Sequence, residues 1–132
     1  MWLAGYLARR PVRSVDDLRH HPLLLSPAGL NVIEVSWVKR LNKEAKATFV
    51  STISLVLSAA AKASAGLAVL PRYLGDKEPA LVRVPMPDPP SEPIWLTVHR
   101  DLQKTPQVRV VRDFLVRSLK EDQTLLEGAK WR

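Results

Sequence analysis

The sequence of 132 residues contains no cysteine. Disulfide bonds and thiolate chemistry are therefore excluded, and a reducing compartment suits the chain. A long hydrophobic run is also missing, because the longest apolar stretch, residues 53–61, is interrupted by Ser54 and Ser58 and is too short to span a bilayer. The start, MWLAGYLARR, places its charge after a short apolar run, which is the reverse of the order in a signal peptide. We expect a cytoplasmic protein with no membrane partner.

The motifs of common enzyme and metal sites are missing as well. There is no P-loop, no GxGxxG fingerprint and no GxSxG elbow. His20 and His21 are adjacent, so their rings diverge instead of converging on one metal ion. His99 lies two residues before Asp101, and such a pair could serve a hydrolase, but no nucleophile motif accompanies it. We expect no enzymatic activity, no metal and no cofactor.

Composition is compatible with one folded domain, because 46% of the residues are hydrophobic. The chain has 20 Lys and Arg against 13 Asp and Glu, a net charge of +7. Such a charge favours nucleic acid or anionic surfaces. The basic residues are spread among acidic ones, as in Arg112-Asp113, and no basic recognition helix is visible. We therefore expect no dedicated nucleic-acid face.

Hydrophobic periodicity and turn residues predict an α/β fold, a mixed sheet flanked by helices. Helices are predicted over residues 1–10, over 15–20 behind the N-cap Ser14, from Ile53 to Ser64-Ala65, and from Pro106 behind the cap Thr105. Strands are predicted over residues 23–25, 33–37, 45–49, 67–70, 81–84 and 94–98. Residues 85–93 hold five prolines and predict an irregular surface loop.

Polar groups could converge at the junction Val50-Ser51-Thr52, between a predicted strand and a predicted helix. Two hydroxyls lie there at a helix N-terminus, where free N–H groups and the helix dipole favour an anion. The alternative is that a hydroxyl simply caps the helix and no ligand binds. Both readings of the junction stay open.

The stretch 66–76, GLAVLPRYLGD, combines a strand with a corner. Pro71 stops the strand because proline has no N–H to donate, and residues 73–75 close a short turn. A helix, a strand and a corner in this order are typical of an α/β domain with a ligand crevice at the carboxyl end of the strand.

Four motifs in order carry a family resemblance: DLRHHPLL at 17–24, GLAVLP at 66–71, LVRVP at 81–85 and WLTVHRDLQKTPQVRVVRDFL at 95–115. In this order and spacing they resemble the effector-binding domain of LysR-type transcriptional regulators, over about residues 3–119. That resemblance implies a type 2 periplasmic-binding-protein fold with two lobes, a small molecule in the cleft between them, and DNA binding by a separate helix-turn-helix domain.

The resemblance implies that this chain is a partial effector-binding domain. Residues 1–98 correspond to the second lobe and hinge strand, and residues 99–132 to the returning C-terminal helix and tail. The DNA-binding domain is expected to be absent, so that DNA would be bound only through a domain outside this chain. The family usually has glycine where Ser64 stands, and a left-handed serine there would cost up to ~1 kcal/mol.

The resemblance also places the ligand site. The implied ligand-binding residues are Val50, Ser51, Thr52, Leu70 and Pro71. The predicted function is effector sensing within a LysR-type regulator, with a small anionic effector, such as a carboxylate, as the predicted partner. The alternative is an interaction module without a ligand, which pairs with itself or with a full-length regulator. An apolar helical stripe predicts a homo-oligomer, and its members are Val108, Val111, Leu115 and Leu119, with Phe114 close by.

Overall fold

The computed structural model describes residues 2–3, 11–27 and 32–127. The chain divides into two compact units, Met1–Pro90 and Ser91–Arg132, and each is described by itself. The division into a lobe over 1–98 and a returning helix and tail over 99–132 concerns a larger two-lobed domain and stays a prediction.

A five-stranded mixed sheet forms the centre of the first unit, in the order β3-β2-β4-β1-β5. The strands are β1 (Trp2–Leu3), β2 (Leu23–Leu25), β3 (Ala47–Val50), β4 (Leu67–Ala68) and β5 (Val82–Arg83). Strand β2 pairs in parallel with β3 and β4, whereas β1 pairs antiparallel with β4 and β5. The predicted mixed α/β fold is confirmed. The predicted helix over residues 1–10 is wrong at Trp2–Leu3, and its other residues lie outside the described part.

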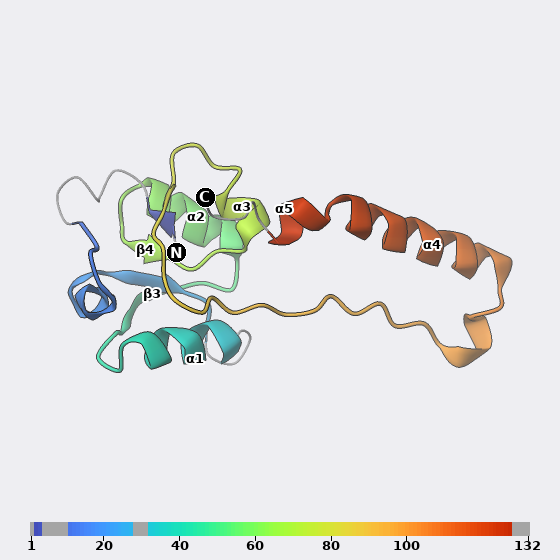
Figure 1. The fold of residues 1–132 in the computed structure, drawn as a ribbon, viewed down its shortest axis with the longest axis horizontal. Helices are drawn as coiled ribbons and strands as arrows, with labels where there is room; N and C mark the ends of the chain where they lie inside the picture. The colour runs from blue at the N-terminus through green and yellow to red at the C-terminus, as the bar shows by residue number, and fades with distance from the viewer. Residues whose placement is uncertain (1, 4–10, 28–31, 128–132) are drawn as a thin grey trace. The chain divides into compact units, whose positions relative to one another are not determined.

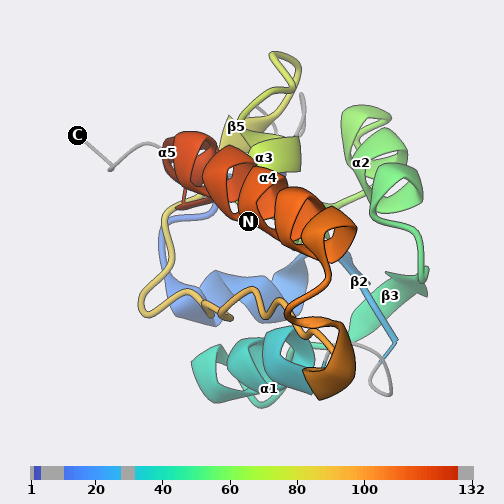
Figure 2. The ribbon, with the colours of Figure 1, turned by 90° about the vertical axis from the view of Figure 1, so that its right-hand side faces the viewer.

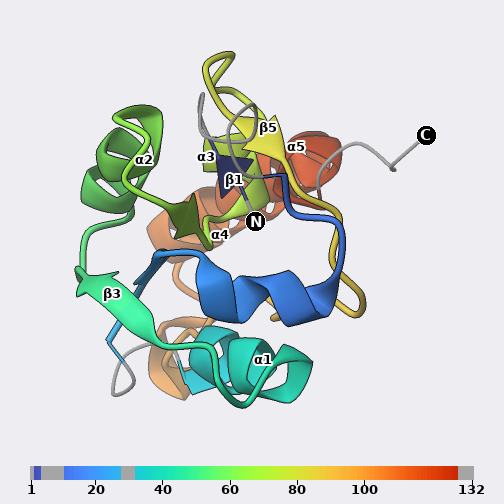
Figure 3. The same ribbon diagram turned by 90° about the vertical axis from the view of Figure 1, so that its left-hand side faces the viewer.

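Helices cover both faces of the sheet, and Figures 1 and 3 show α1 and α2 on opposite sides of the strands. The helical segments of this unit are the 3-10 helix η1 (Val15–His20), α1 (Val32–Leu41), α2 (Ser54–Lys62) and α3 (Arg72–Gly75). One buried cluster includes Leu18, Leu23, Leu25, Trp37, Val38, Leu67 and Val69. The other includes Leu24, Leu57, Ala61, Ala68, Leu70 and Leu81. Because neighbouring residues of β2 and β4 belong to different clusters, both faces of these strands are buried.

Helix α1 replaces the strand that alternation predicted over residues 33–37, so that prediction is wrong. The same segment also fits a helical period, because Trp37, Val38 and Leu41 lie on one side of a helix. Trp37 and Val38 are 3% and 2% exposed and belong to the core. The Trp37 indole Nε1 donates a hydrogen bond to the carbonyl of Pro87, 3.0 Å away, and so ties the proline-rich loop to α1.

Two residues after α2 have unusual backbone requirements. Ser64 is left-handed (φ 62°), and its N–H donates to the carbonyl of Ala61 while the N–H of Ala65 donates to that of Ala60. This is the hydrogen-bond pattern of a Schellman motif, which favours glycine at the left-handed position. The following Gly66 packs so closely that a methyl group there would overlap the carbonyl oxygen of Pro22.

The second unit consists of an extended segment and helices. Its elements are the 3-10 helix η2 (Arg100–Leu102), α4 (Pro106–Glu121) and α5 (Gln123–Glu127), and α4 begins behind Thr105 as predicted. The strand predicted over residues 94–98 is wrong, because this segment pairs with no described strand. Helix α4 is one continuous helix in Figure 2. None of its side chains is buried, and those of Val111 and Leu115 are 56% and 38% exposed.

Candidate functional site

The order of the strands produces a switch point at one edge of the sheet. Strands β2, β3 and β4 are parallel, so their carboxyl ends meet at the same edge. The chain leaves β2 for α1, which packs in one core cluster, and leaves β3 for α2, which packs in the other. The connection from β2 leads to β3 on one side and that from β4 leads to β5 on the other, so a crevice opens between the carboxyl ends of β2 and β4, where α/β sheets bind ligands.

The predicted junction lies at this edge. Val50 is the last residue of β3 and pairs with Leu25 at the end of β2. The N–H of Ser51 donates to the carbonyl of Leu25 at 3.2 Å, which continues the contact one residue past the strand. Val50 and Thr52 are exposed and Ser51 is half-buried. The junction therefore offers two hydroxyls and an apolar side chain at the carboxyl end of β3.

The N-cap of α2 is Ile53, so the prediction that Ser51 or Thr52 caps this helix is wrong. The Ser51 hydroxyl oxygen instead accepts the N–H of Ile53 at 3.2 Å and shapes the turn that precedes the helix. The Ile53 side chain cannot accept a hydrogen bond from the first turn. The positive end of the α2 dipole therefore lies beside Ser51 and Thr52 without a side-chain cap from its own N-cap residue.

The predicted corner lies on the other side of β2. The N–H of Val69 donates to the carbonyl of Leu24 at 3.3 Å, so the parallel ladder of β4 extends one residue beyond the assigned strand. Leu70 is 4% exposed and packs in the core, so only its backbone reaches the edge. Pro71 is half-buried and its carbonyl accepts the N–H groups of Leu74 and Gly75, which start α3. Two strand spacings separate β3 from β4, or about 10 Å.

Ser26 is a further residue at this edge that the sequence analysis did not single out. It follows the last residue of β2, between the junction and the corner, and it is buried. The local signal was a run of three leucines followed by Ser26-Pro27. Its central place depends on the strand order, which joins residues far apart in the chain.

The remaining polar groups do not assemble into a metal site in the described part of the chain. The ring nitrogen Nδ1 of His99 accepts the N–H of Asp101 at 3.3 Å and caps η2, and both side chains are exposed. No described group of three or more His, Asp or Glu side chains is arranged to hold a metal ion. Among the described helices, none is long and apolar enough to cross a membrane.

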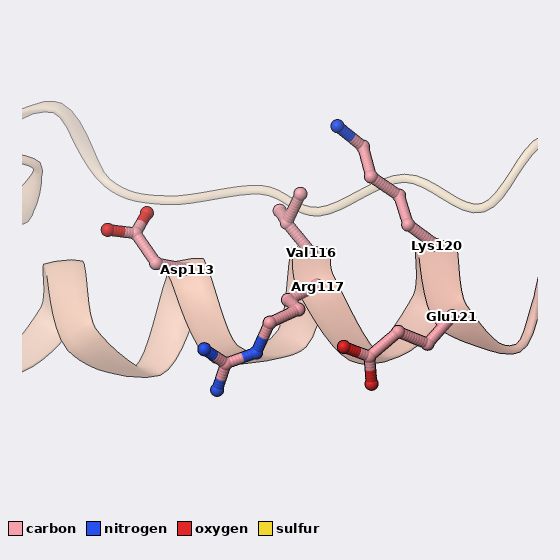
Figure 4. Close-up of a pocket in the computed structure, with 5 residues that line it drawn as sticks. All are labelled: Asp113, Val116, Arg117, Lys120 and Glu121. Atoms are coloured by element: carbon pink, nitrogen blue, oxygen red, sulfur yellow. The ribbon is translucent and has the colours of Figure 1, made fainter.

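A shallow hollow runs along α4, and none of the predicted site residues lines it. It is lined by Asp113, Val116, Arg117, Lys120 and Glu121, all from one helix (Figure 4). Asp113, Val116 and Lys120 point to one side of α4, whereas Arg117 and Glu121 point to the other (Figure 4). Two acids and two bases line it, so their charges balance and the hollow has no preference for an ion of one sign.

Comparison with known proteins gives one family. No curated protein and no solved structure matches the chain. The family model of the LysR substrate binding domain matches residues 3–120, nearly the whole chain. The mixed sheet of the chain, flanked by helices, agrees with the periplasmic-binding-protein-like fold of that domain. The resemblance found in the sequence motifs is thereby confirmed, and the chain belongs to the LysR substrate-binding domain family of transcriptional regulators.

Proposed function

We propose that this chain senses a small anionic effector for a LysR-type regulator and binds it at the carboxyl edge of β2, β3 and β4. The observation that carries the proposal is the switch point, which brings the junction 50–52 and the corner 70–71 to the two sides of the end of β2. In this proposal DNA recognition belongs to another domain, and the protein acts in the cytoplasm, as regulators of this family do.

The chemistry of the edge favours an anion such as a carboxylate. The first-turn N–H groups of α2 and the hydroxyls of Ser51 and Thr52 are hydrogen-bond donors, and the helix dipole adds positive potential. None of the five proposed ligand residues is ionisable, so no negative charge among them opposes the ligand. The exposed side chain of Val50 and the ring of Pro71 supply apolar surface for the rest of the effector.

An NMR titration of the isotopically labelled chain with small organic acids tests this site. We expect amide shifts at residues 50–55 and 69–72, with weaker effects from the matching uncharged amides. The double substitution Ser51→Ala, Thr52→Ala should weaken binding by about a hundredfold, because two hydrogen bonds to a charged group, each worth ~1.5 kcal/mol or more, are lost. The control Ser118→Ala removes a hydroxyl from α4 and should leave the affinity unchanged. Shifts confined to the 85–93 loop, with none near Ser51, would contradict the proposal.

The interaction-module alternative is favoured by one observation on α4. Its apolar stripe includes Val111, Phe114 and Leu115, and none of these side chains is buried. Each large apolar side chain that becomes covered contributes ~1.5–3 kcal/mol, so the stripe favours association with a second copy.

Sedimentation at several concentrations tests the association. We expect a reversible dimer, and Leu115→Glu should weaken it while Arg109→Glu, on the charged side of the same helix, has little effect. A well-folded monomer at every concentration would exclude this alternative and leave the effector proposal untouched.

A further inference from the structure

Four exposed cations lie at the end of α1 and in the turn that leads to β3. We call Lys39, Arg40, Lys43 and Lys46 the basic turn. The backbone beneath them is well held: the N–H of Asn42 donates to the carbonyl of Val38 at 2.9 Å, and that of Ala45 donates to Asn42 at 3.2 Å. Val38 and Ala45 are buried, so the chain on either side of the turn is anchored in the core.

The acid within the basic turn is already paired. The carboxylate of Glu44 lies 3.2 Å from the guanidinium of Arg19, which η1 brings in as a fifth cation. The η1 helix also carries Asp16 and Asp17, and the Asp17 carboxylate accepts the backbone N–H groups of Arg13 and Ser14 at 2.8 and 2.9 Å. The Arg19–Glu44 pair carries no net charge, which leaves the four cations of the basic turn. Asp16 is exposed, and its carbonyl accepts the side-chain amide of Asn42 at 3.3 Å, so this acid lies beside the turn.

The end of the helix explains only part of this cluster. Cations in the last turn of α1 interact favourably with the helix dipole, which accounts for Lys39 and Arg40. Lys43 and Lys46 lie beyond the end of the helix, so interaction with the helix dipole does not account for them. On α4, by contrast, Arg112 is paired with the neighbouring Asp113 at 2.6 Å, so positive charge is locally cancelled.

We infer that the basic turn is a contact surface for the phosphate backbone of duplex DNA. The chain belongs to a family of transcriptional regulators, which work at DNA, and the cations would meet phosphates without reading bases. The turn precedes the amino end of β3, whereas the proposed effector site lies at its carboxyl end. The inference therefore goes beyond the effector proposal and can fail independently of it.

Binding of the 132-residue chain to a duplex of arbitrary sequence, measured by fluorescence anisotropy over a series of salt concentrations, tests the inference. Four phosphate contacts predict a slope of log affinity against log salt of about −3.6. The variant K39Q/R40Q/K43Q/K46Q should lose most of this slope and bind at least tenfold more weakly at low salt. The matched control K104Q/R109Q/R117Q/K120Q removes the same charge from the second unit and should keep most of the affinity.

A gain-of-binding variant separates electrostatics from misfolding. Asp16→Asn removes an acid beside the basic turn and should strengthen binding by a few-fold, which a damaged fold cannot do. Equal losses in the two quadruple variants would assign binding to dispersed charge and overturn the inference. So would binding of polyglutamate as tight as that of DNA, since the surface would then select any polyanion.

Discussion

The two units of the chain use their apolar side chains in opposite ways. In the first unit, β2 and β4 are only three and two residues long, yet they contribute buried side chains to clusters on both faces. In the second unit, α4 runs for 16 residues with a clear apolar stripe, and none of its side chains is buried. An apolar pattern thus predicts that a helix forms, but burial requires a second layer to pack against it.

Shortening one apolar side chain in each unit should give the largest difference in stability, because such side chains are buried in the first unit and exposed on α4. The side chain of Leu67 in β4 is fully buried in the core. Leu67→Ala should therefore lower the free energy of unfolding by about 2–5 kcal/mol. Val110 in α4 is 70% exposed, and Val110→Ala should change the free energy of unfolding by less than about 0.5 kcal/mol. Urea unfolding of both variants checks this. Equal losses would mean that the exposed side of α4 is covered in solution.

A substitution at Gly66, directly before β4, should destabilise the fold nearly as much. Gly66→Ala places a methyl group against the carbonyl of Pro22, which also accepts the N–H of Leu67 at 2.9 Å. Because backbone on both sides must move, we expect a loss of about 1–3 kcal/mol in the free energy of unfolding. The matched change Gly75→Ala, at the end of α3, isolates the effect of this close approach. An unchanged melting temperature for Gly66→Ala would contradict the packing described at β4.

Within the same unit, a smaller and favourable effect is expected at the end of α2. Ser64 is left-handed, a conformation that glycine adopts without steric cost, so Ser64→Gly should raise the free energy of unfolding by about 0.5–1 kcal/mol. Ala63→Gly is the control, because Ala63 has a negative φ and gains nothing from glycine. Thermal melts distinguish the two, and destabilisation by both would rule out the left-handed helix end.

The smallest effect concerns pH at the start of η1. The backbone N–H groups of Arg13 and then Ser14 hold the pKa of Asp17 below its ordinary value of 3.8. A lowered pKa in the folded state stabilises above pH 3.8, and that contribution disappears as pH falls through the folded value. We expect Asp17→Asn to be slightly less stable than the parent at pH 7, and this difference in the free energy of unfolding should shrink as the pH falls below 3.8. A difference that persists at low pH would assign the effect to packing.

Local sequence predicted the secondary structure well where a single serine or proline determines where a helix begins or where regular structure is interrupted. Ser14 before η1, Pro106 at the start of α4 and the prolines of 85–93 all act through their own backbone or side chain, and each was placed correctly. Short alternating runs were less reliable. Residues 33–37 alternate like a strand and yet form α1, because Trp37 and Val38 also share a helical face that the core buries.

Part of the candidate site could be predicted from local sequence, and part depends on the order of the strands. Its residues could be named from the sequence, since Ser51 and Thr52 stand between a strand and a helix and Pro71 ends a strand. Their convergence could not be derived from local pattern, because it needs β2 between β3 and β4. For the same reason Ser26, in the middle of that edge, went unnoticed. The effector itself stays part of the proposal and awaits the titration.

The sequence by itself determined the class of the fold, the family and the identity of the residues at the sheet edge, because short motifs in a set order carry that information. Tertiary structure alone decided which strands are neighbours and that Arg19 of η1 pairs with Glu44 in the basic turn. It also decided that the α4 stripe is not buried. The physical reason is that pairing and burial depend on segments far apart in the chain, whereas turn and cap preferences depend on a few adjacent residues.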